Sequence, residues 1–169
     1  MMEHMRKEVR FMNRLMKLQG ALLAEIEKYA KIHDENGVEL DYPIDWERIH
    51  VISCAKLGYL FGEERGVDPI LAACACAVHD YGRIITGRQA NHAEVGYEPV
   101  RDFLRETGLF SEEEVEEIGL SVKNHSNKSE VGTPLEEIVK DADVLDFHQY
   151  GYAMPRPEQQ ARLNRMLKG

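Results

Sequence analysis

The run Ile70–Val78 (ILAACACAV) constrains this chain more than any other segment, because it carries no charged side chain. Asp68 and Pro69 stand directly before it, as an N-cap residue and a proline at the first helical position. The small, apolar residues of the run predict a buried helix. The run is too short to cross a bilayer. We therefore expect an internal helix that ends near His79 and Asp80.

Helical signals recur along the rest of the chain. Ser111 with Glu114, and Thr133 with Glu136, form two capping boxes, each ahead of apolar positions at helical spacing. Asp45 is the expected N-cap of a helix that runs to about Glu64. The segment 81–91 holds two glycines and predicts an irregular loop. Further helices are expected at about 92–106 and 157–167.

No segment alternates apolar and polar residues in the manner of a strand, so no sheet is expected. The predicted fold class is all-α, a compact bundle of about six or seven helices. The length of 169 residues favours one domain, which would span 1–169 with an N-terminal helical extension at 1–34 and a C-terminal helix at 157–168.

The N-terminal extension predicts one long amphipathic helix or two stacked ones. Its apolar residues recur every three or four positions: Met5, Val9, Met12, Met16, Leu22, Leu23 and Ile26. A methionine stripe of this kind is typical of a helix that packs on a core or on a partner helix. A homodimer through the N-terminal helix is therefore an option.

The net charge of −9 disfavours binding to large nucleic acids, which need a basic face. It leaves room for a small anionic substrate. The three cysteines are an odd number without a disulfide pattern, and two of them lie in the buried run, so we interpret them as core residues in a reducing compartment. Charged residues near the N-terminus are unlike a signal peptide or a membrane span, and we expect a cytoplasmic protein.

Histidines and aspartates at helix ends, or within helices, form a candidate metal site. The ordered set is His50, His79, Asp80, His92, His125 and Asp143. A single histidine on a helix is more often a core or surface group than a ligand. Six such residues in order, each beside apolar positions that fix its helix, are a stronger signal, because imidazole and carboxylate suit Zn, Mn, Fe or Mg.

This ordered set resembles the HD-domain superfamily of metal-dependent phosphohydrolases over about residues 45–150. The matching stretches are RIHVISCAKLGYLF around His50, LAACACAVHDYGR around His79 and Asp80, NHAEVGYEPVRDFL at His92, SVKNHSNKSE at His125 and LEEIVKDADVLDF at Asp143. The pair His79-Asp80 after a helix of small residues and the closing KDADVLD are the most specific of them.

The resemblance implies an α-helical core with one or two divalent ions (Fe, Mn, Mg, Zn, Co or Ni). His50, His79, Asp80 and Asp143 match the basic metal site, and His92 and His125 match the histidines of members with a second metal. Asp80 is the implied catalytic residue, bridging the ions if there are two. Asp141 and Asp146 rival Asp143, and Asp146 fits a supporting position one turn away on the same helix face. The remaining histidines, His4, His33 and His148, match no position and are expected at the surface.

The resemblance implies hydrolysis of a phosphoester or phosphoanhydride in a nucleotide or a similar small phosphorylated substrate, with a metal-activated water. Charge stabilisation calls for cations near the metal, and the candidates for substrate binding are Arg83, Arg88 and Lys128. Two alternatives remain open. One is a di-iron oxygenase on the same scaffold, and the other is a regulatory module that binds metal or nucleotide without turnover.

Overall fold

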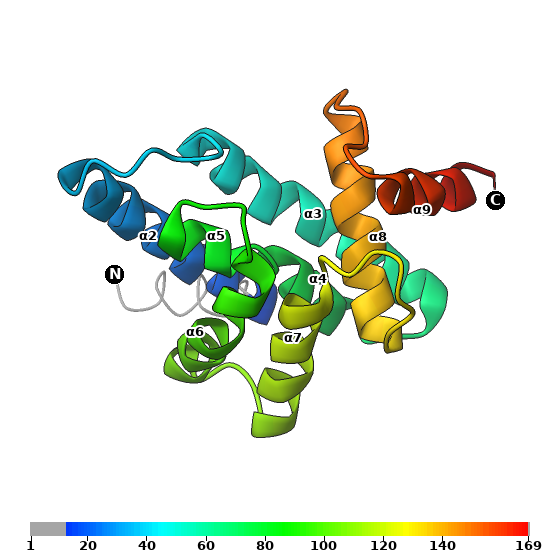
Figure 1. Cartoon of the computed structure of the whole chain (residues 1–169). Coiled ribbons are helices and arrows are strands. Elements are labelled where there is room, and N and C mark those ends of the chain that lie inside the picture. Colours follow the sequence, from blue (N-terminus) through cyan, green and yellow to red (C-terminus); the bar gives the residue numbers. More distant parts are fainter. Residues whose placement is uncertain (1–12, 169) are drawn as a thin grey trace, which may run out of the picture.

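The computed structural model describes residues 13–168, and every regular element among them is a helix, so the all-α prediction is confirmed (Figure 1). The helices are α2 (Arg14–Glu35), α3 (Ile44–Arg65), α4 (Pro69–Val78), α5 (Tyr81–Thr86), α6 (His92–Thr107), α7 (Glu112–Asn124), α8 (Pro134–Gln149) and α9 (Pro157–Lys168). None of the described helices is long and apolar enough to span a membrane.

Helix α4 is the centre of the fold, as the run Ile70–Val78 predicts. Its residues from Leu71 to Val78 are all buried, and helices α2, α3, α7 and α8 pack around it. Gly58 and Gly62 of α3 let the two backbones approach: a Cβ on Gly58 would lie 2.9 Å from the Ala72 carbonyl oxygen. The close contact fixes the end of α4, where His79 and Asp80 follow.

The helix caps mostly agree with the sequence prediction. The Asp68 carboxylate accepts from the backbone N–H of Ile70 and Leu71, and Ser111 forms both arms of a capping box with Glu114. Thr133 caps α8 through Glu136 N–H, but the reciprocal arm is missing because the Glu136 carboxylate accepts from Asn124 instead.

The prediction for Asp45 is wrong. Helix α3 begins two residues earlier than predicted, with Pro43 as the N-cap, so that Asp45 lies in the first turn. A carboxylate there is favourable because it faces the positive end of the helix dipole.

The loop predicted over 81–91 contains the short helix α5. Gly82, read in the sequence as a loop signal, instead permits close packing: a Cβ at this position would lie 1.9 Å from the His92 carbonyl oxygen. Gly87 then ends α5 with a φ of 72°, a left-handed conformation that glycine adopts without strain. The result is that α5 and α6 touch backbone to backbone, which places Asp80 beside His92.

The N-terminal helix α2 lies along α3 and α4 and buries Leu18, Leu22 and Ile26. Met16 of the methionine stripe is 38% exposed. The other stripe positions Met5, Val9 and Met12, and the histidine His4, lie outside the described residues. The expectation of a homodimer through this helix stays a prediction.

His33 at the end of α2 corrects a second prediction. It was expected at the surface, but it is 5% exposed and its Nε2 lies 2.9 Å from the Ile84 carbonyl oxygen. The ring therefore ties α2 to α5 and has a structural role. His148 is half-buried in the last turn of α8.

Helix α9 is held to the rest of the fold by Arg162, whose side chain is 2% exposed. Its guanidinium donates to the carbonyl oxygens of Lys128 and Glu130 and to the carboxylates of Glu137 and Asp141. Since the Lys128–Glu130 segment borders the pocket described below, this one side chain fixes both α9 and a wall of that pocket.

Candidate metal centre

The pair His79-Asp80 forms the junction between α4 and α5. His79 directly follows the last residue of α4, and Asp80 occupies the N-cap position of α5. His79 Nδ1 lies 2.7 Å from the Cys76 carbonyl oxygen. A carbonyl only accepts hydrogen bonds, so Nδ1 donates and Nε2 is the ring nitrogen left to face the site. The last turn of α4 thus aims His79 Nε2 into the site.

The same arrangement recurs at two other histidines. His92 Nδ1 donates to the Gln89 carbonyl oxygen at 2.7 Å, and His125 Nδ1 donates to the Val122 carbonyl oxygen at 2.6 Å. In each case the acceptor lies three residues before the histidine, at a helix terminus. Both rings therefore also present Nε2 as a lone-pair donor.

His50, one turn and a half into α3, is oriented by a side chain instead. Its Nδ1 lies 2.6 Å from Asp146 Oδ2. Asp146 also accepts from the Ser53 hydroxyl at 2.8 Å. Asp146 was predicted to support the site from one turn beyond Asp143, and it lies directly behind His50.

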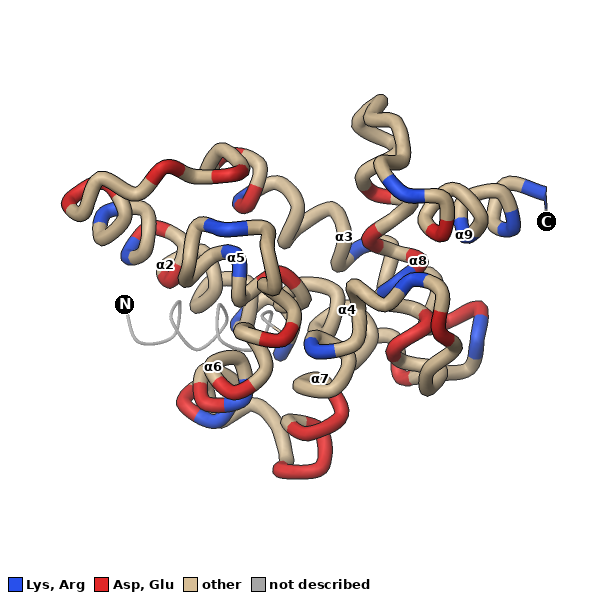
Figure 2. The backbone as a smooth tube through the Cα atoms, in the orientation of Figure 1, with Lys and Arg blue, Asp and Glu red and all other residues tan. Residues whose placement is uncertain are grey.

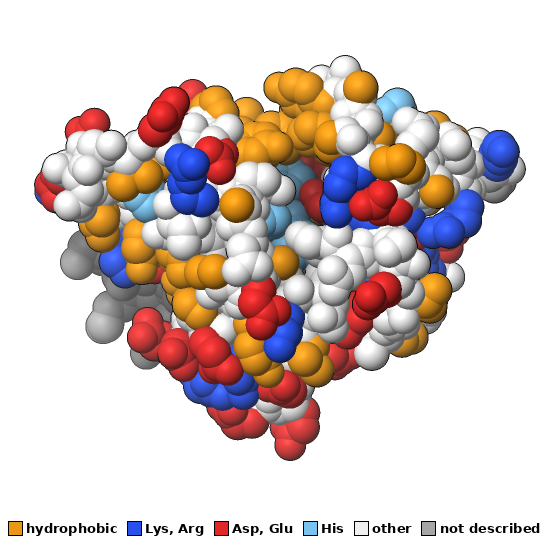
Figure 3. Space-filling view, viewed as in Figure 1, with side chains coloured by type: hydrophobic (Ala, Val, Ile, Leu, Met, Phe, Trp, Pro, Cys, Tyr) orange, Lys and Arg blue, Asp and Glu red, His pale blue; other side chains and the backbone are white. Residues whose placement is uncertain are grey.

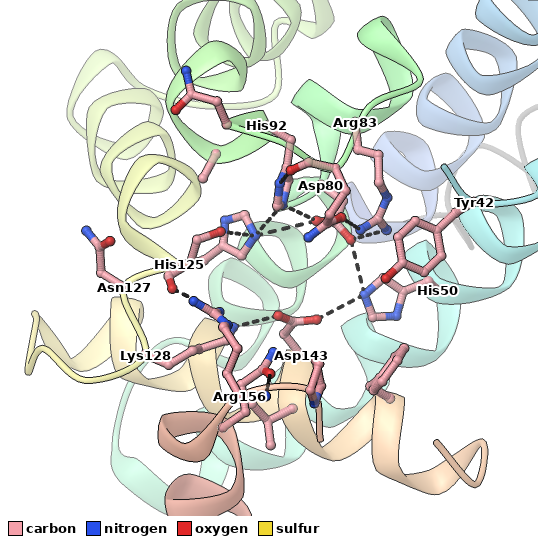
Figure 4. A pocket seen from close by; sticks show the side chains of 18 of the residues that line it. Tyr42, His50, Asp80, Arg83, His92, His125, Asn127, Lys128, Asp143 and Arg156 are labelled. Atoms are coloured by element: carbon pink, nitrogen blue, oxygen red, sulfur yellow. Dashed lines mark hydrogen bonds and ion pairs between the residues drawn. The ribbon is translucent and has the colours of Figure 1, made fainter. Parts of the chain in front are cut away.

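Two carboxylates meet the first pair of histidines. His50 Nε2 and His79 Nε2 are 3.2 Å apart. Asp80 Oδ2 lies 3.3 and 3.2 Å from these two nitrogens, and Asp143 Oδ1 lies 3.3 and 3.4 Å from them. Four donor atoms from α3, the α4–α5 junction and α8 thus surround one point. Figure 4 shows three of the residues, His50, Asp80 and Asp143, converging there.

The second pair shares Asp80 with the first. His92 Nε2 and His125 Nε2 are 3.0 Å apart, and Asp80 Oδ1 lies 3.0 Å from the former and 3.4 Å from the latter. Asp80 therefore faces one histidine pair with each carboxylate oxygen. That is the geometry of a carboxylate that bridges two adjacent cation sites.

The donor spacing tests whether metal ions fit. Ligand atoms at about 2.0–2.2 Å from a cation, at tetrahedral to octahedral angles, are about 3.0–3.5 Å from each other, and the observed distances of 3.0–3.4 Å fall in this range. Lone pairs that face each other this closely repel unless a positive charge lies between them. The residues present therefore fit one divalent cation at each histidine pair.

Electrostatics support a positive charge at this point. Burial alone would raise the pKa of Asp80, but the Arg83 guanidinium and His79 hold it well below its usual range. Burial would likewise raise the pKa of Asp143, but Lys128 and His79 outweigh it. Burial lowers the pKa of His125 to about 4, against the opposing pull of Asp80, so that this imidazole is neutral and free to donate to a metal.

The pKa values of the first histidine pair, His50 and His79, are shifted upward. Burial would lower the pKa of His50, yet hydrogen bonds to Asp143, Asp146 and Asp80 raise it well above its ordinary value. Burial also opposes the charge on His79, and Asp80 again outweighs it, so the pKa of His79 is raised as well. A point that favours a proton this strongly equally favours a metal cation.

Cys54 lies beside His50 and His79, close enough to count among their possible co-ligands. Burial raises the pKa of its thiol well above the ordinary value, so the sulfur is protonated. The three cysteines are free and buried, in agreement with their interpretation as core residues.

His50, Asp80, His92 and His125 line a pocket of about 570 Å³ that opens to the surface (Figure 3). Part of its lining is apolar and largely aromatic, with Tyr42, Trp46, Phe147, Met154 and Pro155. Another part is polar: Gln89, Asn91, Lys123, Ser126, Asn127, Lys128, Arg156 and Gln159. An amphipathic pocket above a cation site suits a substrate with one anionic end and one planar or apolar part.

The structure brings together all six residues that the sequence singled out as ligands. Arg83 and Lys128 line the same pocket, but Arg88 does not: its guanidinium donates to the Glu39 carbonyl oxygen and pairs with Asp41, at the far end of α5. Asp141, a rival to Asp143, instead pairs with Arg65 and Arg162.

Lys128 is more constrained than a surface cation. Its side chain is 1% exposed, and Nζ lies 2.5 Å from Asp143 Oδ2. It therefore holds the oxygen of Asp143 that does not face the histidines. His92 and His125 line the same pocket, beside Asn91, Ser126 and Asn127, and both residues are nonetheless buried, at 4% and 1% exposure.

Glu47 and the aromatic residues of the pocket were not predicted from the sequence. Glu47 is 3% exposed and bound to Arg83, with Nε 2.6 Å from Oε1. Its position three residues before His50 was an available signal, because residues at that spacing share a helix face. No sequence signal was available for Tyr42, Trp46 and Arg156. Tyr42 and Trp46 lie shortly before His50, but Arg156 precedes α9, and only the tertiary fold brings it to the same pocket.

A comparison with protein families matches residues 48–147 to the HD domain, a stretch that contains all six ligand positions. The chain belongs to the HD-domain family. This assignment agrees with the helical core and with a buried cluster of histidine and aspartate that is able to bind divalent metal. No curated protein and no solved structure matched the chain in the corresponding searches.

Proposed function

We propose that this protein is a metal-dependent phosphohydrolase that acts on a nucleotide or a similar small phosphorylated compound. The observation that carries the proposal is the placement of Asp80, with one carboxylate oxygen toward each histidine pair. When bound at these pairs, divalent cations polarise a phosphoryl oxygen and lower the pKa of water.

The residues of the chain orient the imidazole rings and place a fixed charge beside the site. The three backbone carbonyls and Asp146 fix the tautomer of each imidazole, so the nitrogens need no rearrangement on binding a cation. Lys128 places a fixed positive charge beside Asp143 at the pocket wall. Preorganised charge of this kind is the main source of acceleration in phosphoryl transfer.

The pocket walls support a substrate that combines a phosphate with a planar group. Trp46, Tyr42 and Phe147 offer aromatic surface near the cation site, and the polar lining residues offer amides and cations. Acidic residues dominate the surface at the start of α7, where Glu112, Glu113 and Glu114 follow each other (Figure 2). We therefore expect a small substrate and no large nucleic acid.

The test is a metal analysis of anaerobically purified protein, followed by a panel of phosphomonoesters and nucleotides with release of phosphate as the readout. We expect hydrolysis that stops after chelation and returns on addition of a divalent cation. Asp80→Asn should abolish it, whereas His148→Ala should leave it unchanged. Consumption of dioxygen without release of phosphate would replace the proposal by an oxygenase, and metal binding without turnover would indicate a regulatory module.

A further inference from the structure

Three buried charges form a chain behind the metal centre: Glu47, Arg83 and Asp80. Their exposed fractions are 3%, 6% and 3%. Arg83 Nε lies 2.6 Å from Glu47 Oε1, and Nη2 lies 3.2 Å from Glu47 Oε2. The same Nη2 also donates to Asp80 Oδ2. Arg83 thus lies between two carboxylates that are isolated from bulk water.

The guanidinium has little freedom to leave this position. Nη1 donates to the Gln89 side chain at 2.8 Å, and the Tyr42 ring covers the guanidinium face with its centroid 4.5 Å from Cζ. With these bonds, most of the five N–H groups of Arg83 are engaged within the protein. Reaching out to a substrate would break several of them, so the contacts favour a role in holding Asp80 over a role as a mobile substrate clamp.

Glu47 and Arg83 each lie one helical turn from a proposed metal ligand. Glu47 and His50 are three residues apart on α3, and Asp80 and Arg83 are three residues apart at the start of α5. Residues at this spacing lie on one helix face. The Glu47–Arg83 pair therefore joins the two helices at the point where each supplies a ligand to the same cation site.

From this geometry we propose that Glu47 is a positioning residue of the metal centre, which acts through Arg83 on the orientation and the charge of Asp80. The inference rests on the proposed function only in requiring that the site binds a divalent cation.

The charges explain why a carboxylate is needed at position 47. Glu47, Arg83 and Asp80 together carry a net charge of −1, which attracts a cation to Asp80. Without the charge of Glu47 the same three positions sum to zero, and the buried guanidinium neutralises the ligand. Interactions of this kind are strong because the groups are shielded from water. Loss of the Glu47 charge should therefore weaken metal binding even though Glu47 contacts no metal.

The experiment measures the affinity for Mn²⁺ alone by isothermal titration calorimetry. We expect Glu47→Gln to fold and to bind Mn²⁺ about tenfold more weakly, an effect of about 1.4 kcal/mol. The double variant Glu47→Gln with Arg83→Gln restores the net charge of −1, so it should regain most of that affinity. It lacks the tether on Asp80, so its kcat should stay low. If Glu47 contributed to stability alone, Glu47→Gln would lower the melting temperature and the double variant would not recover Mn²⁺ affinity.

Glu114→Gln is the matched control. Glu114 also receives two hydrogen bonds from an arginine, Arg14, but it lies at the start of α7, the opposite end from His125. The control should lower stability and leave Mn²⁺ affinity within twofold of the wild type. Glu47→Gln that folds and retains wild-type affinity overturns the inference.

Arg83→Lys is a second variant. It keeps the charge but lacks the planar fork of donors with which Arg83 reaches Glu47, Gln89 and Asp80 at once. If Glu47→Gln fails to fold, Arg83→Lys decides: a severalfold loss of Mn²⁺ affinity supports the inference, and unchanged affinity overturns it. A wild-type protein that binds Mn²⁺ but hydrolyses no phosphoester contradicts the proposed function alone. Absence of Mn²⁺ binding in the wild type overturns the inference about Glu47.

Discussion

Trp46 lies flat against His50, with ring centroids 4.9 Å apart and planes inclined by 19°. Trp46 is the one tryptophan of the chain, and His50 is a proposed ligand. Since indole emission responds to charge and to paramagnetic ions nearby, Trp46 reports on the site directly. We expect titration with Co²⁺ or Ni²⁺ to quench the intrinsic fluorescence in a saturable manner that chelation reverses. A spectrum that does not change at saturating metal would contradict a cation beside His50.

Loss of a shared ligand should remove metal and activity together. Asp80→Ala takes away the carboxylate that faces both histidine pairs, and His79→Ala takes away one nitrogen with its carbonyl-fixed tautomer. We expect metal content to fall to near zero by elemental analysis in both variants. His148→Ala is the control and should retain both properties. His33→Ala should lower stability through the lost bond to Ile84, yet keep the metal. Full activity in Asp80→Ala would refute the proposed mechanism.

The second histidine pair should control stoichiometry. The Nε2 atoms of His92 and His125 face Asp80 Oδ1, so mutation of either histidine to alanine removes no donor atom of His50, His79 or Asp143. We expect metal content to change from near two ions per chain to near one, with activity reduced by several orders of magnitude. A saturated wild-type protein with a single ion would instead assign these two histidines to phosphate binding or proton transfer.

Gly82 is expected to be intolerant of any side chain. In Gly82→Ala the new Cβ would overlap the His92 carbonyl oxygen and crowd the Gly96 backbone, so that α6 must move away from α5. We expect a loss of more than about 2 kcal/mol in the free energy of unfolding and weaker binding of the second metal. Gly20→Ala, inside α2, is the contrasting change: apart from neighbouring residues of α2, no atom of the described residues 13–168 lies within 4 Å of the added Cβ. It should stabilise by about 0.5–1 kcal/mol. Chemical denaturation of both variants in chelator gives the comparison.

The pH dependence of stability should depend in part on Glu137. Burial alone would raise its pKa, but the hydrogen bond from Arg162 and the Gly132 N–H lower it to about 2. A carboxylate whose pKa is depressed in the folded state stabilises above its ordinary pKa, and this contribution is lost as the pH falls toward 2. We expect the melting temperature of the metal-free protein to drop between about pH 4.5 and pH 2. Glu137→Gln should lower it by about 5 °C at neutral pH and flatten the acid limb; an unchanged acid limb would contradict this assignment.

The sequence was sufficient for much of the site because its ligands belong to local patterns. Helix ends at Asp68, Ser111 and Thr133 were readable from caps, and the ligands His79, Asp80 and His125 follow directly on helices defined in this way. Asp146 was placed correctly from its spacing to Asp143 alone.

The remaining features depend on contacts between distant segments. The role of Gly82 is visible only when α6 lies against it, and a glycine in a polar stretch otherwise indicates a loop. Arg88 lies in the same predicted loop, but its contacts with Glu39 and Asp41 hold it away from the pocket. Glu47 is an ordinary helix residue until Arg83, 36 positions later, is brought to it.

The three carbonyl acceptors described for His79, His92 and His125 lie three residues before the rings that they orient. Each of these imidazoles is therefore aimed by its own short segment and keeps its donor nitrogen as long as one helical turn survives. His50 differs, because Asp146 stands 96 positions away on α8, the helix that also carries Asp143. Separation of α8 from the core thus removes one ligand and misaligns another in a single event. The geometry of the first histidine pair therefore depends on the contact between α3 and α8.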